Sequence, residues 1–235
     1  MKSILFILLL AGLTLSACGG APAATPLPAV TPTAGETAAT QAATQPAGPT
    51  AETGAAGPVT FKIVPGESRA SYEVGETFLN QDNRFNLAIG VTSAVNGEIY
   101  ADLANLPAST LGEISIDISQ LTSDSSRRDN AIRGDWLESS RFPMAVFKPT
   151  GIESLPVRYV EGQEYAFRVT GDLTVKETTL PVTFDVTAAL RGDTLTGKAT
   201  TTILLSQFGV GPISILSVLK TEDEAKITLE FVARP

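Results

Sequence analysis

Apolar and polar residues alternate along most of the chain that follows residue 58. The alternation is clear in GEISIDIS (residues 112–119), EYAFRVTGDLTV (164–175) and AKITLEFVA (225–233), and turn-forming Gly, Pro, Asn and Asp separate such runs. Successive side chains of a strand point to opposite faces of a sheet, so this pattern predicts β-strands with one buried face. The segment from about Ser125 to Ser140 lacks the alternation and predicts a short helix or helical turn.

About eight or nine such strands follow one another within residues 59–235, a length that suits one domain with a substantial core. So many strands must close into a barrel or split into a sandwich, because either arrangement removes exposed strand edges. A barrel of about eight strands is just wide enough to fill itself with side chains or to hold one slender apolar ligand. The sequence therefore predicts an all-β domain, and periodicity leaves open whether its centre is filled or hollow.

The first residues predict export and lipid attachment. MKSILFILLLAGL places Lys2 before about a dozen apolar residues, which suits a secretory signal and is short for a membrane span. The letters LSAC that end at Cys18 resemble the bacterial lipobox, in which cleavage leaves the cysteine at the N-terminus carrying diacylglycerol. We therefore expect a lipoprotein signal peptide over residues 1–17 and lipidation at Cys18, which anchors the chain stably because two acyl chains are attached.

Residues 18–58 consist almost entirely of Ala, Thr, Pro and Gly after the cysteine. Such a composition cannot bury enough apolar surface to fold, so it predicts a disordered linker. In an extended polyproline-like form, at about 3.1 Å per residue, its roughly 40 residues reach on the order of 120 Å. The expected product is an extracytoplasmic domain that is lipid-anchored to the cell membrane and able to move well clear of it.

Composition excludes several classes of enzyme. The chain has no histidine and one cysteine, Cys18, so Ser-His-Asp, Cys-His and zinc-hydrolase sites cannot form. Neither GxxxxGK[ST] nor GxGxxG occurs, and a net charge of -8 argues against nucleic acid as a partner. Carboxylates such as Asp117 with Asp124, or Glu222 with Asp223 and Glu224, are the remaining catalytic candidates, and their exposure to solvent in polar loops or at strand ends accounts for them without catalysis. We predict no enzyme activity, no metal and no cofactor.

Five sequence motifs follow one another in this domain: FKIVPGESRASYEV (61–74), VTSAVNGEIYAD (91–102), the block 114–152, VTGDLTVKETTLPVTFDV (169–186) and LLSQFGV (204–210). The first two are an aromatic-x-Ile segment followed by Ser, an aromatic residue and Val, and a loop and strand with Gly-x-Ile. The other three are a central block with Arg-Asp, Leu and Phe-Pro, a Gly-x-Leu-Thr block ending in Pro-Val, and a Ser-x-x-Phe-Gly turn. In this order the motifs resemble those of the YceI-like family. The chain departs from the family at Asp135-Trp136-Leu137, where a His-Leu pair is frequent, and it has a single Phe142 in place of a double Phe.

The resemblance implies an extended eight-stranded antiparallel lipocalin-like β-barrel over residues 59–235, whose tunnel holds a polyisoprenoid or a similar long-chain amphiphile. It implies a carrier or buffer of lipid, with the isoprenoid and the membrane as partners; a homodimer stays open. The alternative is a cell-surface structural or interaction module with a filled barrel and no ligand. The bulky apolar residues on or beside the matched motifs are the expected lining: Tyr72, Phe85, Ile89, Trp136, Phe142, Phe147, Phe167 and Phe208.

Overall fold

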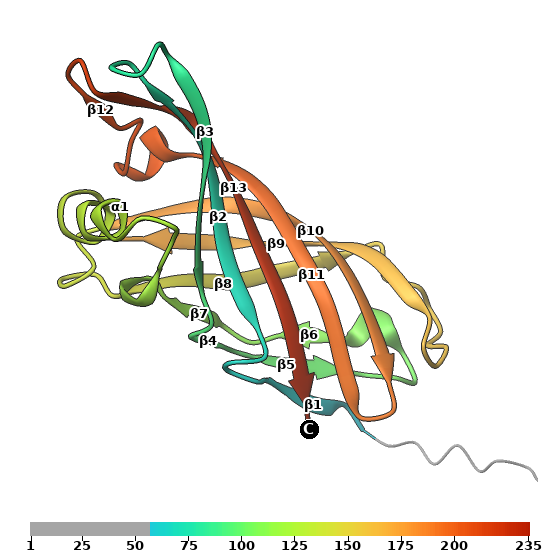
Figure 1. The fold of residues 1–235 in the computed structure, drawn as a ribbon. Helices are drawn as coiled ribbons and strands as arrows, with labels where there is room; N and C mark the ends of the chain where they lie inside the picture. Colours follow the sequence, from blue (N-terminus) through green and yellow to red (C-terminus); the bar gives the residue numbers. More distant parts are fainter. Residues whose placement is uncertain (1–56) are drawn as a thin grey trace, which may run out of the picture. The chain divides into compact units, whose positions relative to one another are not determined.

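The computed structural model describes residues 57–235, and their strands pair in one sheet whose pairings are all antiparallel (Figure 1). The expected signal peptide, Cys18 and nearly all of the expected linker lie outside the described residues. The strands are β1 Val59–Ile63, β2 Arg69–Phe78, β3 Arg84–Thr92, β4 Val95–Asn96, β5 Glu98–Ala101, β6 Thr110–Leu111, β7 Ile114–Asp117, β8 Met144–Glu153, β9 Glu164–Val175, β10 Thr178–Arg191, β11 Thr194–Leu204, β12 Ser214–Ile215 and β13 Leu219–Arg234.

The long C-terminal strand β13 organises the sheet. One of its edges pairs with β11, and its other edge pairs first with β2 and then, at its end, with β1. Successive hairpins add β10, β9 and β8 beyond β11, so neighbours in sequence are also neighbours in space. The strands twist and curl into a half-barrel, as Figure 1 shows, with one face turned inward. The prediction of an all-β antiparallel domain is confirmed.

The expected number of eight strands is wrong, because the sheet formed by residues 57–235 has thirteen. Three of them, β4, β6 and β12, are only two residues long. β4 and β5 lie on either side of Gly97 and pair with different strands, β7 and β1 respectively. The chain changes partners at this point, so a stretch that reads as one alternating run in the sequence forms two short strands.

The segment without alternation is helical, as predicted. Ser125 caps helix α1, Ser126–Ala131, by accepting a hydrogen bond from the Arg128 backbone N–H at 3.3 Å. A single π-helical turn, η3 Ile132–Trp136, continues it. The other short helical turns are η1 Leu106–Ala108, η2 Ile118–Gln120 and η4 Leu205–Phe208. Within residues 57–235, no helix has the length and apolar character needed to cross a bilayer.

Candidate functional site

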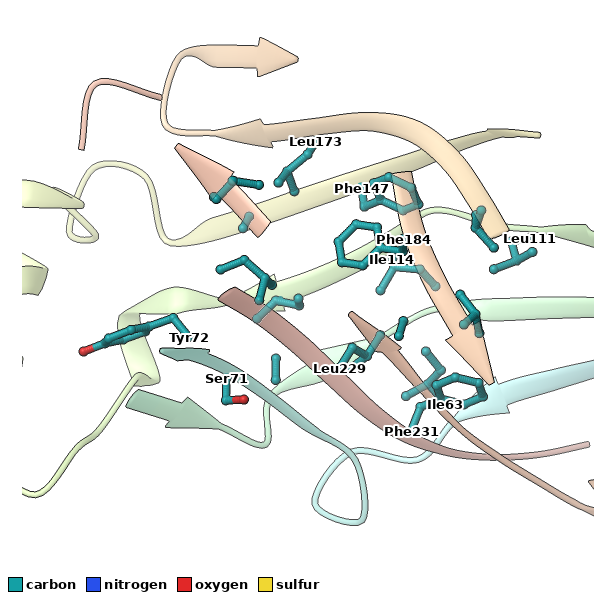
Figure 2. A pocket seen from close by; sticks show the side chains of 18 of the residues that line it. Ile63, Ser71, Tyr72, Leu111, Ile114, Phe147, Leu173, Phe184, Leu229 and Phe231 are labelled. Carbon is teal, nitrogen blue, oxygen red and sulfur yellow. The ribbon is translucent and has the colours of Figure 1, made fainter. Parts of the chain in front are cut away.

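The inward face of the curled sheet encloses an apolar cavity of about 310 Å³. This volume lies near the lower end of the roughly 300–1,000 Å³ that ligand pockets occupy. Nearly every strand contributes inward-facing side chains to its wall, together with η3 and η4. Figure 2 labels ten of the lining residues: Ile63, Ser71, Tyr72, Leu111, Ile114, Phe147, Leu173, Phe184, Leu229 and Phe231.

Strand periodicity explains why this wall is apolar. In β9 the residues Phe167, Val169 and Leu173 line the cavity, while Arg168 and Asp172 between them are exposed. One strand thus presents a continuous apolar row to the inside and a charged row to solvent. The same arrangement on neighbouring strands builds a wall whose surface is almost entirely apolar.

Two phenylalanines meet edge to face within this wall. The ring centroids of Phe147 on β8 and Phe184 on β10 lie 5.0 Å apart, with 74° between the ring planes. Aromatic pairs favour this geometry because the positive ring edge meets the negative ring face. Gly171, which lies between these strands on β9, leaves room for it, since a Cβ there would stand 2.6 Å from Phe147 Cζ. The inner position of Gly171 is therefore filled by the neighbouring ring.

Five of the eight residues expected to line a tunnel do line the cavity. They come from five different elements and are Tyr72 on β2, Trp136 on η3, Phe147 on β8, Phe167 on β9 and Phe208 on η4. The structure therefore brings together side chains that are up to 136 positions apart, from Tyr72 to Phe208. That these residues bind a ligand stays a prediction.

The expected lining positions of Phe85 and Ile89 are wrong. Both lie on β3 with their side chains on its outer face, where they are 60% and 44% exposed. The inner face of β3 carries Asn86, Ala88 and Gly90 instead. The bulk of Phe85 and Ile89 suggested that their side chains point inward. The inner side of β3 has little room for them, because side chains of β2 such as Tyr72 already cover it.

Phe142 also lies away from the cavity wall. It occupies the turn before β8, and the guanidinium carbon of Arg141 stands 4.6 Å from the centroid of its ring. Its backbone N–H donates to the carbonyl of Glu138 at 2.9 Å, which holds it in the turn. Phe142 is half-buried there, so its bulk covers this turn and does not fill the centre of the sheet.

Glu76 gives the cavity wall its single charged residue among those described, and the sequence motifs did not reveal it. Its carboxylate accepts two hydrogen bonds of 2.9 Å, from Nε and Nη2 of Arg128, and one of 3.2 Å from Asn86. The side chains of Glu76 and Arg128 are 5% and 13% exposed. Arg128 also binds Ser123 and Asp124, so the cluster ties α1 to the inner face of β2.

Tyr72 lies beside this cluster in the cavity wall. In Figure 2 its hydroxyl points away from the other labelled side chains. Its ring lies against Gly90, its cross-strand partner on β3, where a Cβ would come within 2.2 Å of Tyr72 Cε1. Burial raises the pKa of the Tyr72 hydroxyl to about 12, so it is a neutral hydrogen-bond donor at ordinary pH.

Residues 61–233 match the family model described as the YceI-like domain. The chain belongs to the YceI-like family. Similar solved structures include BcnA from Burkholderia cenocepacia, with 22% sequence identity and a TM-score of 0.56, covering 72% of this chain and 98% of BcnA. A polyisoprenoid binding domain from Saccharophagus degradans has 9% identity and a TM-score of 0.57, with 74% of this chain and 97% of that domain covered. No curated protein matches the chain.

Three of the carboxylates that stood as catalytic candidates in this YceI-like domain, Asp117, Asp124 and Asp223, make structural bonds. Asp117 caps η2, accepting from the Ser119 backbone N–H at 3.0 Å, and Asp223 accepts from the Ser206 backbone N–H at 2.7 Å. Asp124 binds Arg128. Within the part of the chain that the structure describes, no three Asp, Glu, His or Cys side chains gather in a way that suits a metal ion.

Proposed function

We propose that this chain is a membrane-anchored extracytoplasmic binding protein that holds a polyisoprenoid, or a similar amphiphilic lipid, in its apolar cavity. The observation that carries the proposal is the cavity itself, about 310 Å³ of space behind a nearly continuous apolar wall. Well-packed interiors leave few voids larger than a water molecule, so a cavity of this size suits a ligand. The fold shared with a polyisoprenoid binding domain supports the same class of ligand.

The energetics favour a carrier or buffer of lipid. Transfer from water gains about 0.8 kcal/mol per CH₂ group, so a tail of tens of carbons would exceed the roughly 20 kcal/mol that real affinities reach. Such a lipid starts in a membrane, however, which is already apolar. The cavity therefore competes with the bilayer at nearly balanced free energy, which permits both loading and release.

Attachment to the membrane is part of the proposal and rests on Cys18 and the linker that follows it. The LSAC sequence supports lipidation, and a linker of about 40 residues lets the domain approach the bilayer and leave it. Replacing Cys18→Ala should release the protein into the soluble fraction on cell fractionation. Full membrane association of that variant would contradict the anchor and leave the ligand proposal standing.

Solvent extraction of the purified protein, followed by mass spectrometry, tests the ligand. We expect an isoprenoid-type lipid in the extract of the wild type and its loss from Ala199→Phe, because Ala199 lines the cavity and a ring there occupies it. Ala166→Phe is the matched control, since Ala166 lies exposed on the outer face of β9 between Tyr165 and Phe167. Wild-type protein whose extract contains no isoprenoid would favour the alternative, an interaction module without a ligand.

A further inference from the structure

The cavity wall carries a charge pattern that bears on the headgroup of its ligand. Among the described residues that line it there is no lysine, arginine or histidine, and Glu76 is the single ionisable carboxylate. Arg128, the cation nearest to this carboxylate, is already committed, with its Nε and both Nη atoms bonded to Glu76, Ser123 and Asp124. An anionic headgroup drawn into the cavity would meet no cation among these lining residues, and the one charged side chain of the wall, Glu76, already holds Arg128 as its partner.

Burial of a charge without a partner is strongly unfavourable, whereas an uncharged polar group needs one hydrogen bond. The three tyrosines of the wall, whose phenols are its longest-reaching hydroxyl donors, can be compared by their existing bonds. The phenol of Tyr159 donates to Glu161, and that of Tyr165 accepts from the Val160 N–H at 2.8 Å and donates to the Arg158 carbonyl at 3.3 Å. These two tyrosines line the cavity but satisfy their hydroxyls within the protein.

Tyr72 differs from them. Its ring lines the cavity while its hydroxyl makes no hydrogen bond within residues 57–235. The hydroxyl points away from the other side chains labelled in Figure 2 and lies close enough to Glu76 and Arg128 for their charges to act on it. Gly90 fixes the place of the ring, because the Cα hydrogen of Gly90 leaves a space that a Cβ would fill. Among the described tyrosines that line the cavity, Tyr72 thus offers the one phenol O–H that no other protein group uses, in the wall beside the Glu76–Arg128 pair.

We infer that the cavity selects an isoprenoid whose headgroup is uncharged and carries a hydrogen-bond-accepting oxygen, and that the Tyr72 hydroxyl donates to that oxygen. This inference rests on the proposed function and narrows its ligand class. An alcohol, a ketone or a quinone ring meets the requirement. A diphosphate does not, because it would carry its negative charge to a wall whose one ionisable side chain is a carboxylate.

Three probes that share one tail test the inference by calorimetric titration of the purified full-length protein: farnesol, farnesyl diphosphate and the hydrocarbon farnesene. We expect farnesol to bind at least about tenfold more tightly than farnesyl diphosphate. Tyr72→Phe keeps the ring and removes the hydroxyl, so it should weaken farnesol about threefold to tenfold, the effect of one neutral hydrogen bond. The same variant should leave farnesene binding unchanged.

The outcomes separate this inference from the proposed function. Equal affinities for farnesol and farnesyl diphosphate, with farnesene also bound, would overturn the uncharged headgroup while the lipid-binding function stands. An equal loss of farnesol and farnesene binding in Tyr72→Phe would show that the residue only shapes the wall, and would overturn the contact. Failure of all three probes to bind would overturn the proposed function and this inference with it.

Discussion

The ring of Tyr72 on β2 lies against Gly90, the residue directly opposite it on β3. A methyl group at position 90 would come within 2.2 Å of Tyr72 Cε1 and 2.7 Å of its hydroxyl oxygen, so the two residues are matched in size. Paired positions of adjacent antiparallel strands share one face of the sheet, which is why the ring of one residue reaches over the other. The position of the Tyr72 ring in the cavity wall therefore depends on Gly90.

Gly90→Ala should displace the Tyr72 ring and destabilise the protein by about 1–3 kcal/mol, the usual effect of overpacking. Urea denaturation measures the free energy of unfolding. In the double variant Gly90→Ala with Tyr72→Ala the clash is absent, so the two effects should not add. Strict additivity of the two single changes would show that the residues are energetically independent.

The ion pair between Arg128 and Glu76 should contribute strongly to stability. Glu76→Gln removes the buried carboxylate and leaves Arg128 with the exposed Asp124 as its one remaining ionic partner, which we expect to cost up to about 3–5 kcal/mol in the free energy of unfolding. The matched control is Glu153→Gln on β8. Glu153 pairs with Arg168 at 2.7 Å, but both side chains are 55% exposed, so the loss there should be about 0–1 kcal/mol. Similar losses for the two variants would mean that Glu76 does not hold α1 against β2.

The strands and the helical segment could be predicted from the sequence because both depend on local pattern. Alternation marked β9 and β13, and its absence marked α1 and η3. The number of strands could not be predicted, because a strand ends where the chain changes partner. At Gly97 this change depends on β7 and β1, which lie elsewhere in the sequence.

Which face of a strand points inward was predictable only where one face is polar. On β3 the outer face carries Phe85 and Ile89, while the inner face carries small residues that accommodate Tyr72, so hydrophobicity pointed the wrong way. The inward position of Glu76 could have been predicted from the alternation. Glu76 follows Tyr72 and Val74 at intervals of two residues, so its carboxylate lies on the same inward face. Its partner Arg128 lies 52 residues away, and no local pattern connects them.

Tyr72 should release its proton at unusually high pH. Burial raises its pKa to about 12, and the unfolded chain releases the same proton near pH 10. The contribution of the neutral phenol to stability is therefore fully present below about pH 10 and is lost as the pH rises towards 12. Ultraviolet absorbance measures tyrosinate formation as the pH rises. The titration curve of the wild type minus that of Tyr72→Phe gives the titration of Tyr72 alone. The subtraction is needed because burial also raises the pKa of Tyr159 to about 12. A difference curve centred near pH 10 would contradict the buried position of the hydroxyl.

Trp136 should report on the cavity directly, since it is the one tryptophan of the chain and lines the wall from η3. Titration with farnesol should shift or quench its fluorescence, because the ligand replaces solvent beside the indole. Trp136 is half-buried at the helical segment, so Trp136→Ala should weaken the ligand strongly and cost less stability than the about 3–5 kcal/mol typical of a core aromatic. Phe208→Ala is the comparison, because Phe208 also lines the cavity but is only 2% exposed, and should incur that full cost. An unchanged emission on titration, together with equal destabilisation by the two variants, would place Trp136 in the packed core and remove it from the ligand site.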